Sequence, residues 1–252
     1  DGLDYDNPAW WTRATVGSLV DWLRRHPAAA SSFRVLDELV DVAGFHPGAH
    51  GAPGAVDALS RPLLERARDL LAAATRAAPD MTLPWAALEN RPALFCLQEL
   101  AYLERRTGER ERARDLFAWL LALNPFDNPG IRGELITLHL ECRDDERALR
   151  LAEAYPDDLL AAIRFGRVLA LYRLGRRDEA RKVAREAHAH LPLVRDYLVR
   201  KRVRQPAMYG PGFQVGGADQ AWLYRDMARP LWEATPGALA WLQRTLPSGR
   251  GV

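Results

Sequence analysis

Helix-forming segments of this chain recur with small residues and prolines at nearly constant spacing. Two stretches show the same order of marker residues: Gly108, Ala113, Phe117 and Pro125 in one, and Gly175, Ala180, Ala187 and Pro192 in the other. The small residue lets two helices cross closely, and the proline ends the unit because it cannot continue a helix. This pattern restricts the chain to stacked helix pairs, since one pair cannot bury its apolar face alone.

The spacing of one small residue measures the length of the repeat. The alanines in this position, which follow one another at intervals of 46, 35 and 32 residues, are Ala67, Ala113, Ala148 and Ala180. The last two intervals are close to the tetratricopeptide (TPR) period of about 34 residues, and the first carries an insertion. No stretch alternates as a strand does. The sequence therefore predicts an all-α fold: a TPR-like helical-repeat solenoid with an N-terminal helical segment and a Trp-rich C-terminal helical cap.

We expect one continuous domain in three parts. These are N-terminal helices with a Gly/Pro/His loop at 1–56, helical repeats at 57–192, and a basic helix, a Gly/Pro loop and capping helices at 193–252. Hydrophobic periodicity predicts helices at 15–25, 32–42, 62–78, 91–106, 109–123, 130–142, 145–154, 158–174, 177–190, 194–203, 218–232 and 236–246. Thr235 is the expected N-cap of the last helix.

Composition and charge place few limits on function. The 252 residues carry a formal net charge of +2, but residues 161–204 have a balance of +9 and residues 1–60 one of −4. No apolar run approaches the ~18–20 residues of a membrane span, and no signal peptide is expected. Cys96 and Cys142, in apolar helical contexts, are expected to be buried free thiols in a reducing compartment. These features favour a cytoplasmic protein, and the abundance of Ala, Leu and Arg favours a bacterial source.

The most specific motifs lie before and after the helix at 109–123. Asn-Arg-Pro at 90–92 precedes it, and Asn-Pro-Phe-Asp-Asn-Pro-Gly-Ile-Arg at 124–132 follows it. With the C-terminal stretch 219–242, these motifs resemble a group of bacterial TPR-like proteins that have an Asn-Arg-Pro entry and an Asn-Pro-x-Asp-Asn-x-Gly-(Ile/Val)-Arg junction. Residues 90–200 are more faintly similar to the TPR-like core of a eukaryotic ribosome-quality-control subunit family. The resemblance implies a TPR-like fold and brings no settled activity.

The junction also has a structural interpretation. Asn124-Pro125 ends one helix, and Asp127 or Asn128 is expected to cap the next one, with Pro129 in its first turn. Arg132 is expected either to pair with Asp127 or to face a ligand. For a junction between repeats, we favour the structural role.

In a TPR-like array the first helix of each unit lines a concave groove, so its polar and aromatic residues are candidates for binding. The groove candidates are Gln98, Tyr102, Arg105, Thr137, Glu141, Phe165, Tyr172 and Arg173. Aromatic rings beside arginines supply much of the binding energy in recognition surfaces. Phe165 and Tyr172 have a second interpretation, as packing between repeats. The lysine and asparagine clamp of chaperone-binding TPRs is absent, since its positions hold Gln98, Tyr102, Ala162 and Gly166.

A second candidate surface is a run of basic residues after the repeats. The members of this basic patch are Arg195, Arg200, Lys201, Arg202 and Arg204. Such a patch is suited to phosphates or to an acidic partner, and Tyr197 between the cations is a candidate for stacking on an RNA base. Two alternatives stay open: the run is a solvated helix face, or the acids of residues 1–60 fold against it.

Signals for metal binding and catalysis are weak. His46 and His50 lie in a loop with no third ligand nearby, and His139 and Cys142 share a helix face that is expected to pack inside. No nucleophile elbow or nucleotide loop is found, so no catalytic residue, metal or cofactor is assigned. The sequence thus favours a non-enzymatic scaffold that binds a peptide or protein in the concave groove, with no membrane contact. The alternative is an RNA- or ribosome-associated factor that uses residues 195–204.

Overall fold

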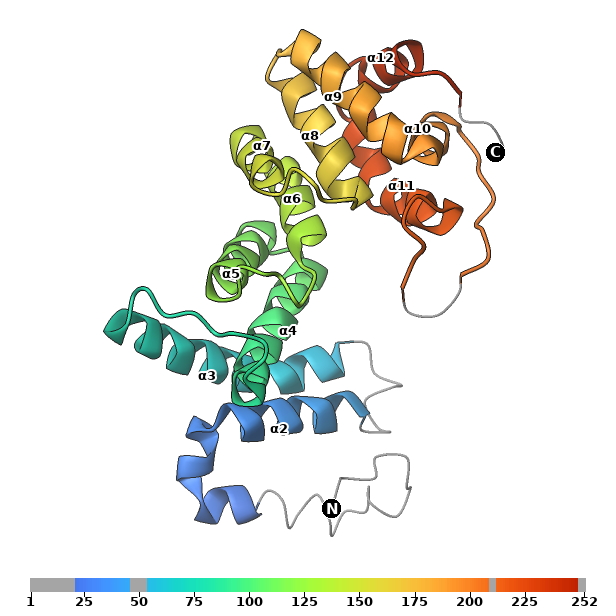
Figure 1. The fold of residues 1–252 in the computed structure, drawn as a ribbon. Helices are drawn as coiled ribbons and strands as arrows, with labels where there is room; N and C mark the ends of the chain where they lie inside the picture. Colours follow the sequence, from blue (N-terminus) through green and yellow to red (C-terminus); the bar gives the residue numbers. More distant parts are fainter. Residues whose placement is uncertain (1–20, 46–53, 209–211, 249–252) are drawn as a thin grey trace. The chain divides into compact units, whose positions relative to one another are not determined.

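The computed structural model describes residues 21–45, 54–208 and 212–248, and every regular element in these ranges is a helix (Figure 1). The all-α prediction is therefore confirmed for this part of the chain. No helix within it is long and apolar enough to cross a bilayer. The chain divides into two compact units: unit 1 ends at Pro129 and unit 2 begins at Gly130. This division falls inside the Asn-Pro junction, whereas the sequence suggested boundaries after residues 56 and 192.

Unit 1 is organised around one central helix, α4, which contacts α2, α3 and α5. Of the first helix expected from the sequence, at 15–25, only residues 21–25 are described, and they are helical. The elements of unit 1 are η2 (Pro27–Ser31), α2 (Phe33–Phe45), α3 (Ala55–Ala77), η3 (Leu88–Asn90), α4 (Arg91–Thr107) and α5 (Arg110–Leu123).

Unit 2 consists of successive helix pairs followed by helices that return onto them. α6 packs with α7 and α8 with α9, and α8 also contacts α6 and α7. α10 contacts α9, α11 and α12, while α11 (red-orange in Figure 1) packs on α8 and α6. The elements of unit 2 are α6 (Arg132–Glu141), α7 (Asp145–Ala154), α8 (Ala161–Arg173), α9 (Arg177–His190), α10 (Pro192–Val199), α11 (Ala218–Glu233) and α12 (Ala238–Thr245).

Small residues lie where helices approach one another most closely. The four alanines that recur at regular spacing in the sequence are all helical and at most 2 % exposed, in agreement with the prediction that they lie at helix contacts. Gly166 of α8 serves the first helices in the same way, because a Cβ atom there would lie 2.9 Å from Cδ1 of Ile136 on α6. The small side chains therefore set the distance between helices. The four alanines are Ala67 on α3, Ala113 on α5, Ala148 on α7 and Ala180 on α9.

Several predicted helix limits are wrong, among them those of α3, α10 and α12. α3 begins before Pro62, which lies inside the helix at an exposed position. Proline has no amide hydrogen, so the carbonyl group four residues earlier loses its helical partner. On the exposed side of the helix, water can bind that carbonyl. α10 ends at Val199 instead of residue 203, and an extended segment follows. α12 starts after Gly237, whose φ of 73° forms the N-cap, so Thr235 does not cap this helix.

The junction after α5 is fixed by the side chain of Asn124, which is 2 % exposed. Its amide donates a 2.9 Å hydrogen bond to the carbonyl of Leu83 and accepts one of 3.0 Å from the backbone N–H of Asn128. Asp127 is buried with a φ of 51°, and Phe126 beside it is 88 % exposed. The N-cap position of α6 is held by Ile131, and not by Asp127 or Asn128 as predicted.

Arg132, at the start of α6, makes its contacts with the loop after α7. Its Nε atom lies 3.3 Å from Oδ2 of Asp158, and its guanidinium lies 4.5 Å from the centre of the Tyr155 ring. These residues border an open hollow of about 380 Å³. Because Asp158 neutralises the arginine, the structural interpretation of this residue is the better supported one.

Candidate binding surfaces

Three groove candidates of unit 1, Gln98, Tyr102 and Arg105, lie along one face of α4. Their spacing of four and three residues places them on successive turns, and each is half-buried. The ring of Tyr102 meets the buried Phe117 edge-on, with 5.1 Å between ring centres. Burial raises the pKa of Tyr102, against the opposing effects of Arg105 and a hydrogen bond with Gln98. The three side chains therefore form an ordered polar and aromatic row, which we call the α4 stripe.

The α4 stripe continues into an aromatic cluster at the start of the helix. Phe95, one turn before Gln98, is 39 % exposed and meets Trp85 edge-on at 5.5 Å. The guanidinium of Arg91 lies 4.7 Å from the centre of the Trp85 ring and donates a 3.1 Å hydrogen bond to the Trp85 carbonyl. Arginine held on an aromatic face is a common component of recognition surfaces.

In unit 2, the groove candidates Thr137 and Phe165 are covered by α11. Thr137 is 2 % exposed, donates a 2.8 Å hydrogen bond to the Gly133 carbonyl, and has its Oγ1 3.5 Å from Sδ of Met227. Phe165 is fully buried, with its ring centre 6.0 Å from that of Tyr224. The prediction that these residues line an open groove is wrong, because α11 occupies this face, and for Phe165 the alternative interpretation as a packing residue agrees with its burial.

Tyr172 and Arg173 tie α8 to the segment between α11 and α12. The Tyr172 hydroxyl donates a 2.9 Å hydrogen bond to the Pro236 carbonyl. Arg173, with a side chain only 4 % exposed, donates to Thr235 Oγ1 at 2.8 Å and pairs with Asp145 at 3.2 Å. It also donates to the carbonyls of Leu140 and Leu231. Both residues are therefore structural, and the sequence prediction of an open groove is corrected here too. Glu141, at the end of α6, is half-buried.

The basic patch separates into one buried and four exposed residues. Arg195, on α10, is 7 % exposed, pairs with the buried Asp196, and donates to the Gln243 carbonyl at 3.0 Å and to Ser248 Oγ at 3.1 Å. Its placement in an exposed patch is therefore wrong. Tyr197, proposed to stack on RNA, is 6 % exposed and belongs to the core. The exposed members are Arg200, Lys201, Arg202 and Arg204.

Two arginines that the sequence reasoning missed hold the basic segment in place. Arg225 of α11 donates to the carbonyls of Arg200 at 2.7 Å and Lys201 at 3.0 Å, and also to that of Tyr197. Arg229 donates to the Leu198 carbonyl at 2.6 Å and to that of Arg200. Their spacing of four residues puts both on one face of α11. That spacing was the available signal in the sequence.

The exposed arginines surround a hollow of about 560 Å³ beyond the end of α10. It lies within one stretch of chain, where the extended segment follows Val199. We call it the basic hollow, and its lining residues are Tyr197, Arg200, Arg202, Val203, Arg204, Gln205, Pro206 and Ala207.

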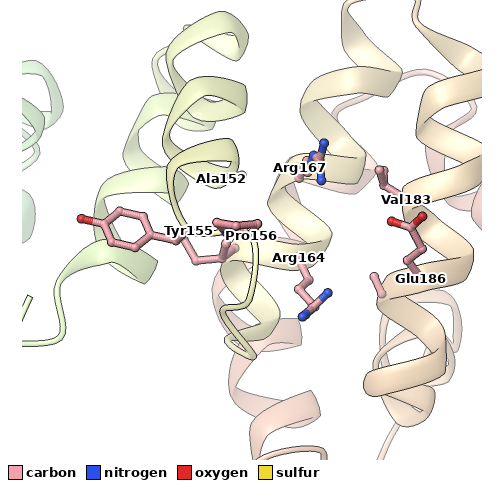
Figure 2. A pocket seen from close by; sticks show the side chains of 9 residues that line it. Ala152, Tyr155, Pro156, Arg164, Arg167, Val183 and Glu186 are labelled. Carbon is pink, nitrogen blue, oxygen red and sulfur yellow. The ribbon is translucent and has the colours of Figure 1, made fainter. Parts of the chain in front are cut away.

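A smaller pocket lies between α7, α8 and α9 (Figure 2). Arg164 and Arg167 of α8 and Glu186 of α9 line it, while Tyr155 and Pro156 close it on the side of α7, with the Tyr155 ring pointing away. Its volume of about 20 Å³ is enough for about one water molecule. It is a packing gap at the helix contact and too small for a ligand.

Among the described residues, no three His, Cys, Asp or Glu side chains are grouped to hold a metal ion. His139 is buried, with Nδ1 4.0 Å from Oδ2 of Asp144. Cys96 and Cys142 are free thiols, the first buried and the second half-buried. His46 and His50 lie outside the described residues.

Comparison of the chain with protein-family models, curated proteins and solved structures finds no match in any of the three.

Proposed function

We propose that the chain is a non-enzymatic, TPR-like helical-repeat protein that binds a peptide or protein partner. The observation that carries the proposal is the α4 stripe in unit 1, together with the exposed Phe95 one turn before it on the same helix. The equivalent face of unit 2 is filled by α11. The proposed binding surface is therefore restricted to unit 1 and does not extend along the whole repeat array.

The composition of the stripe supports binding to a partner segment with apolar and acidic side chains. Phe95 and Trp85 offer ring surface, and Arg91 and Arg105 offer guanidinium groups at either end of the row. The aromatic contacts with Trp85 and Phe117 hold the rings in defined positions. Little side-chain freedom is then lost on binding.

Site-specific photo-crosslinking tests this proposal. A photoreactive amino acid at Gln98 should crosslink a discrete partner in the source cells, and one at the exposed Arg185 of α9 should not. Phe95→Ala/Gln98→Lys should reduce capture of that partner by about tenfold or more, whereas Leu223→Ala, which removes an exposed apolar side chain from α11 of unit 2, should not. Equal crosslinking from both positions, or equal loss in both variants, would contradict a binding role for α4.

A second candidate function is association with RNA or with the ribosome. It is favoured by the exposure of Lys201, Arg202 and Arg204, whose side chains form no ion pair within the described part of the chain. Sedimentation of the chain with ribosomes and with total RNA at low and high salt tests it. Binding that weakens strongly with salt supports the function, because phosphate contacts release counterions. Absence of the chain from both pellets at low salt would exclude it.

A further inference from the structure

We infer that the basic hollow binds phosphate groups in the backbone of single-stranded RNA, and that it does so without reading the bases. The inference rests on the second candidate function and names its site and its ligand chemistry. The first support is the density of available charge. Four exposed cations lie within residues 200–204, and Arg200 alone has an acidic neighbour, Asp196, at 3.8 Å.

The second support is the way in which α11 covers the end of α10. A helix C-terminus carries partial negative charge on its free carbonyl groups, which would repel an anion. Here Arg225 and Arg229 donate hydrogen bonds to those carbonyls. The acid of this helix, Asp196, is buried and paired with Arg195. The positive potential of the exposed cations is therefore not offset by the helix end beneath them.

The chemistry of the lining favours phosphate over carboxylate. Three arginines, Arg200, Arg202 and Arg204, border one hollow. A phosphate group presents several acceptor oxygens in different directions, so more than one guanidinium can bind it. A carboxylate presents two oxygens in one plane, so it offers guanidinium groups fewer directions of approach. The volume of about 560 Å³ also lies within the range of small-ligand pockets.

The same lining offers no platform for a base. The strongest stacking on successive nucleobases comes from exposed aromatic faces. The aromatic residue in the lining, Tyr197, is only 6 % exposed. The other uncharged lining residues are Val203, Gln205, Pro206 and Ala207. With no exposed aromatic ring among the described lining residues, we expect contacts mainly with the phosphates of the strand, and so with little dependence on its sequence.

The test is a fluorescence-anisotropy titration of the full chain with labelled oligo(U) and oligo(A) of equal length across a series of salt concentrations. Without stacking, the two dissociation constants should agree within about threefold. The slope of log K, where K is the association constant, against log salt is negative. The double variant Arg202→Gln/Arg204→Gln should make it shallower by about 1.4, because each phosphate contact to a single strand contributes about 0.7 to its magnitude. The control Lys182→Gln/Arg185→Gln removes equal charge from the exposed face of α9 and should leave the slope unchanged.

Other outcomes would overturn the inference in distinguishable ways. RNA binding with an unchanged slope in Arg202→Gln/Arg204→Gln would exclude the basic hollow but keep the association with RNA. No RNA binding at low salt would exclude both. A preference of about tenfold for one base would show that bases are read. A polyglutamate peptide of equal charge that binds as tightly as RNA would assign the hollow to an acidic protein. Circular dichroism of each variant checks that the helices are intact.

Discussion

The hydroxyl of Tyr172 donates a 2.9 Å hydrogen bond to the backbone carbonyl of Pro236, 64 residues further along the chain. The contact is close, because a Cβ atom on the next residue, Gly237, would lie 3.1 Å from the same hydroxyl oxygen. The contact joins the segment between α11 and α12 to α8. The face of α6 and α8 that was expected to be an open groove is therefore covered by α11 of the same unit. A partner could use that face only by displacing α11, whose Trp232 is fully buried.

Replacing Arg173 with Leu should destabilise unit 2 by about 3 kcal/mol or more, because it leaves Asp145 and several carbonyls without their buried partner. The free energy of unfolding is measured by urea denaturation, with tryptophan fluorescence as the signal. Arg185→Leu, at an exposed position on α9, is the control and should change this free energy by less than about 0.5 kcal/mol. Similar losses in both variants would contradict the role given to Arg173.

Tyr224→Phe should cost about 1–3 kcal/mol, because Nε1 of the buried Trp232 then loses the acceptor that lies 3.1 Å away. Tyr197→Phe serves as the comparison. Tyr197 is also buried, but its hydroxyl makes no hydrogen bond within the described part of the chain. Urea midpoints of the two variants should therefore differ clearly, with Tyr224→Phe the lower. Equal midpoints would show that the hydrogen bond contributes nothing measurable.

Asn124→Ala should destabilise unit 1 by about 1–3 kcal/mol, since the Leu83 carbonyl and the Asn128 amide both lose their partner. Phe126→Ala, two residues away, should leave stability unchanged within about 0.5 kcal/mol, because its side chain is already in water. Thermal unfolding followed by circular dichroism compares the two. A larger loss for Phe126→Ala would mean that the exposed ring, and not Asn124, supports the junction.

The stability of unit 1 should fall as pH rises from about 4 to 7, because of the ionisation of Asp37. Burial, with Asp41, Glu38 and Glu99 nearby, raises its pKa to about 7, against about 3.9 in an unfolded chain. The folded state therefore keeps a proton that the unfolded state has lost, and the free energy of unfolding falls across this window.

The substitution Asp37→Asn removes this titration. It should raise the urea midpoint at pH 8 and leave it unchanged at pH 4. The gain should shrink in high salt, because the side chain is half-exposed and its repulsion is screened. A midpoint gain of equal size at both pH values would mean that the effect comes from packing and not from charge.

Local signals predicted the helices and their small residues well. Ala113 and Ala180 are fully buried, as predicted, because the small residue at the contact of two neighbouring helices is encoded within a short stretch of sequence. Helix ends were less reliable: the pattern extended α10 to residue 203, but the chain turns extended at Arg200, where arginines of α11 bind its carbonyls. That contact joins residues 25 positions apart, so no local pattern reports it.

The binding candidates depended on contacts of still longer range. Arg173 resembles an open groove residue in sequence, yet its partner Thr235 lies 62 residues away. Arg195 and Arg202 look alike in a basic run, but the first meets the Gln243 carbonyl from the far end of the chain and is buried. The placement of α11 decides both cases. The α4 stripe lies within one helix, so the periodicity of that helix was enough to group its residues.

The attachment of the basic segment to α11 has an entropic consequence. A free basic tail would lose backbone freedom when it binds, at a cost of about 1–2 kcal/mol for each residue that becomes fixed. Here the carbonyls of Arg200 and Lys201 are already held by Arg225. At these two residues that cost has therefore been met during folding, so a ligand encounters a segment whose start is ordered before contact.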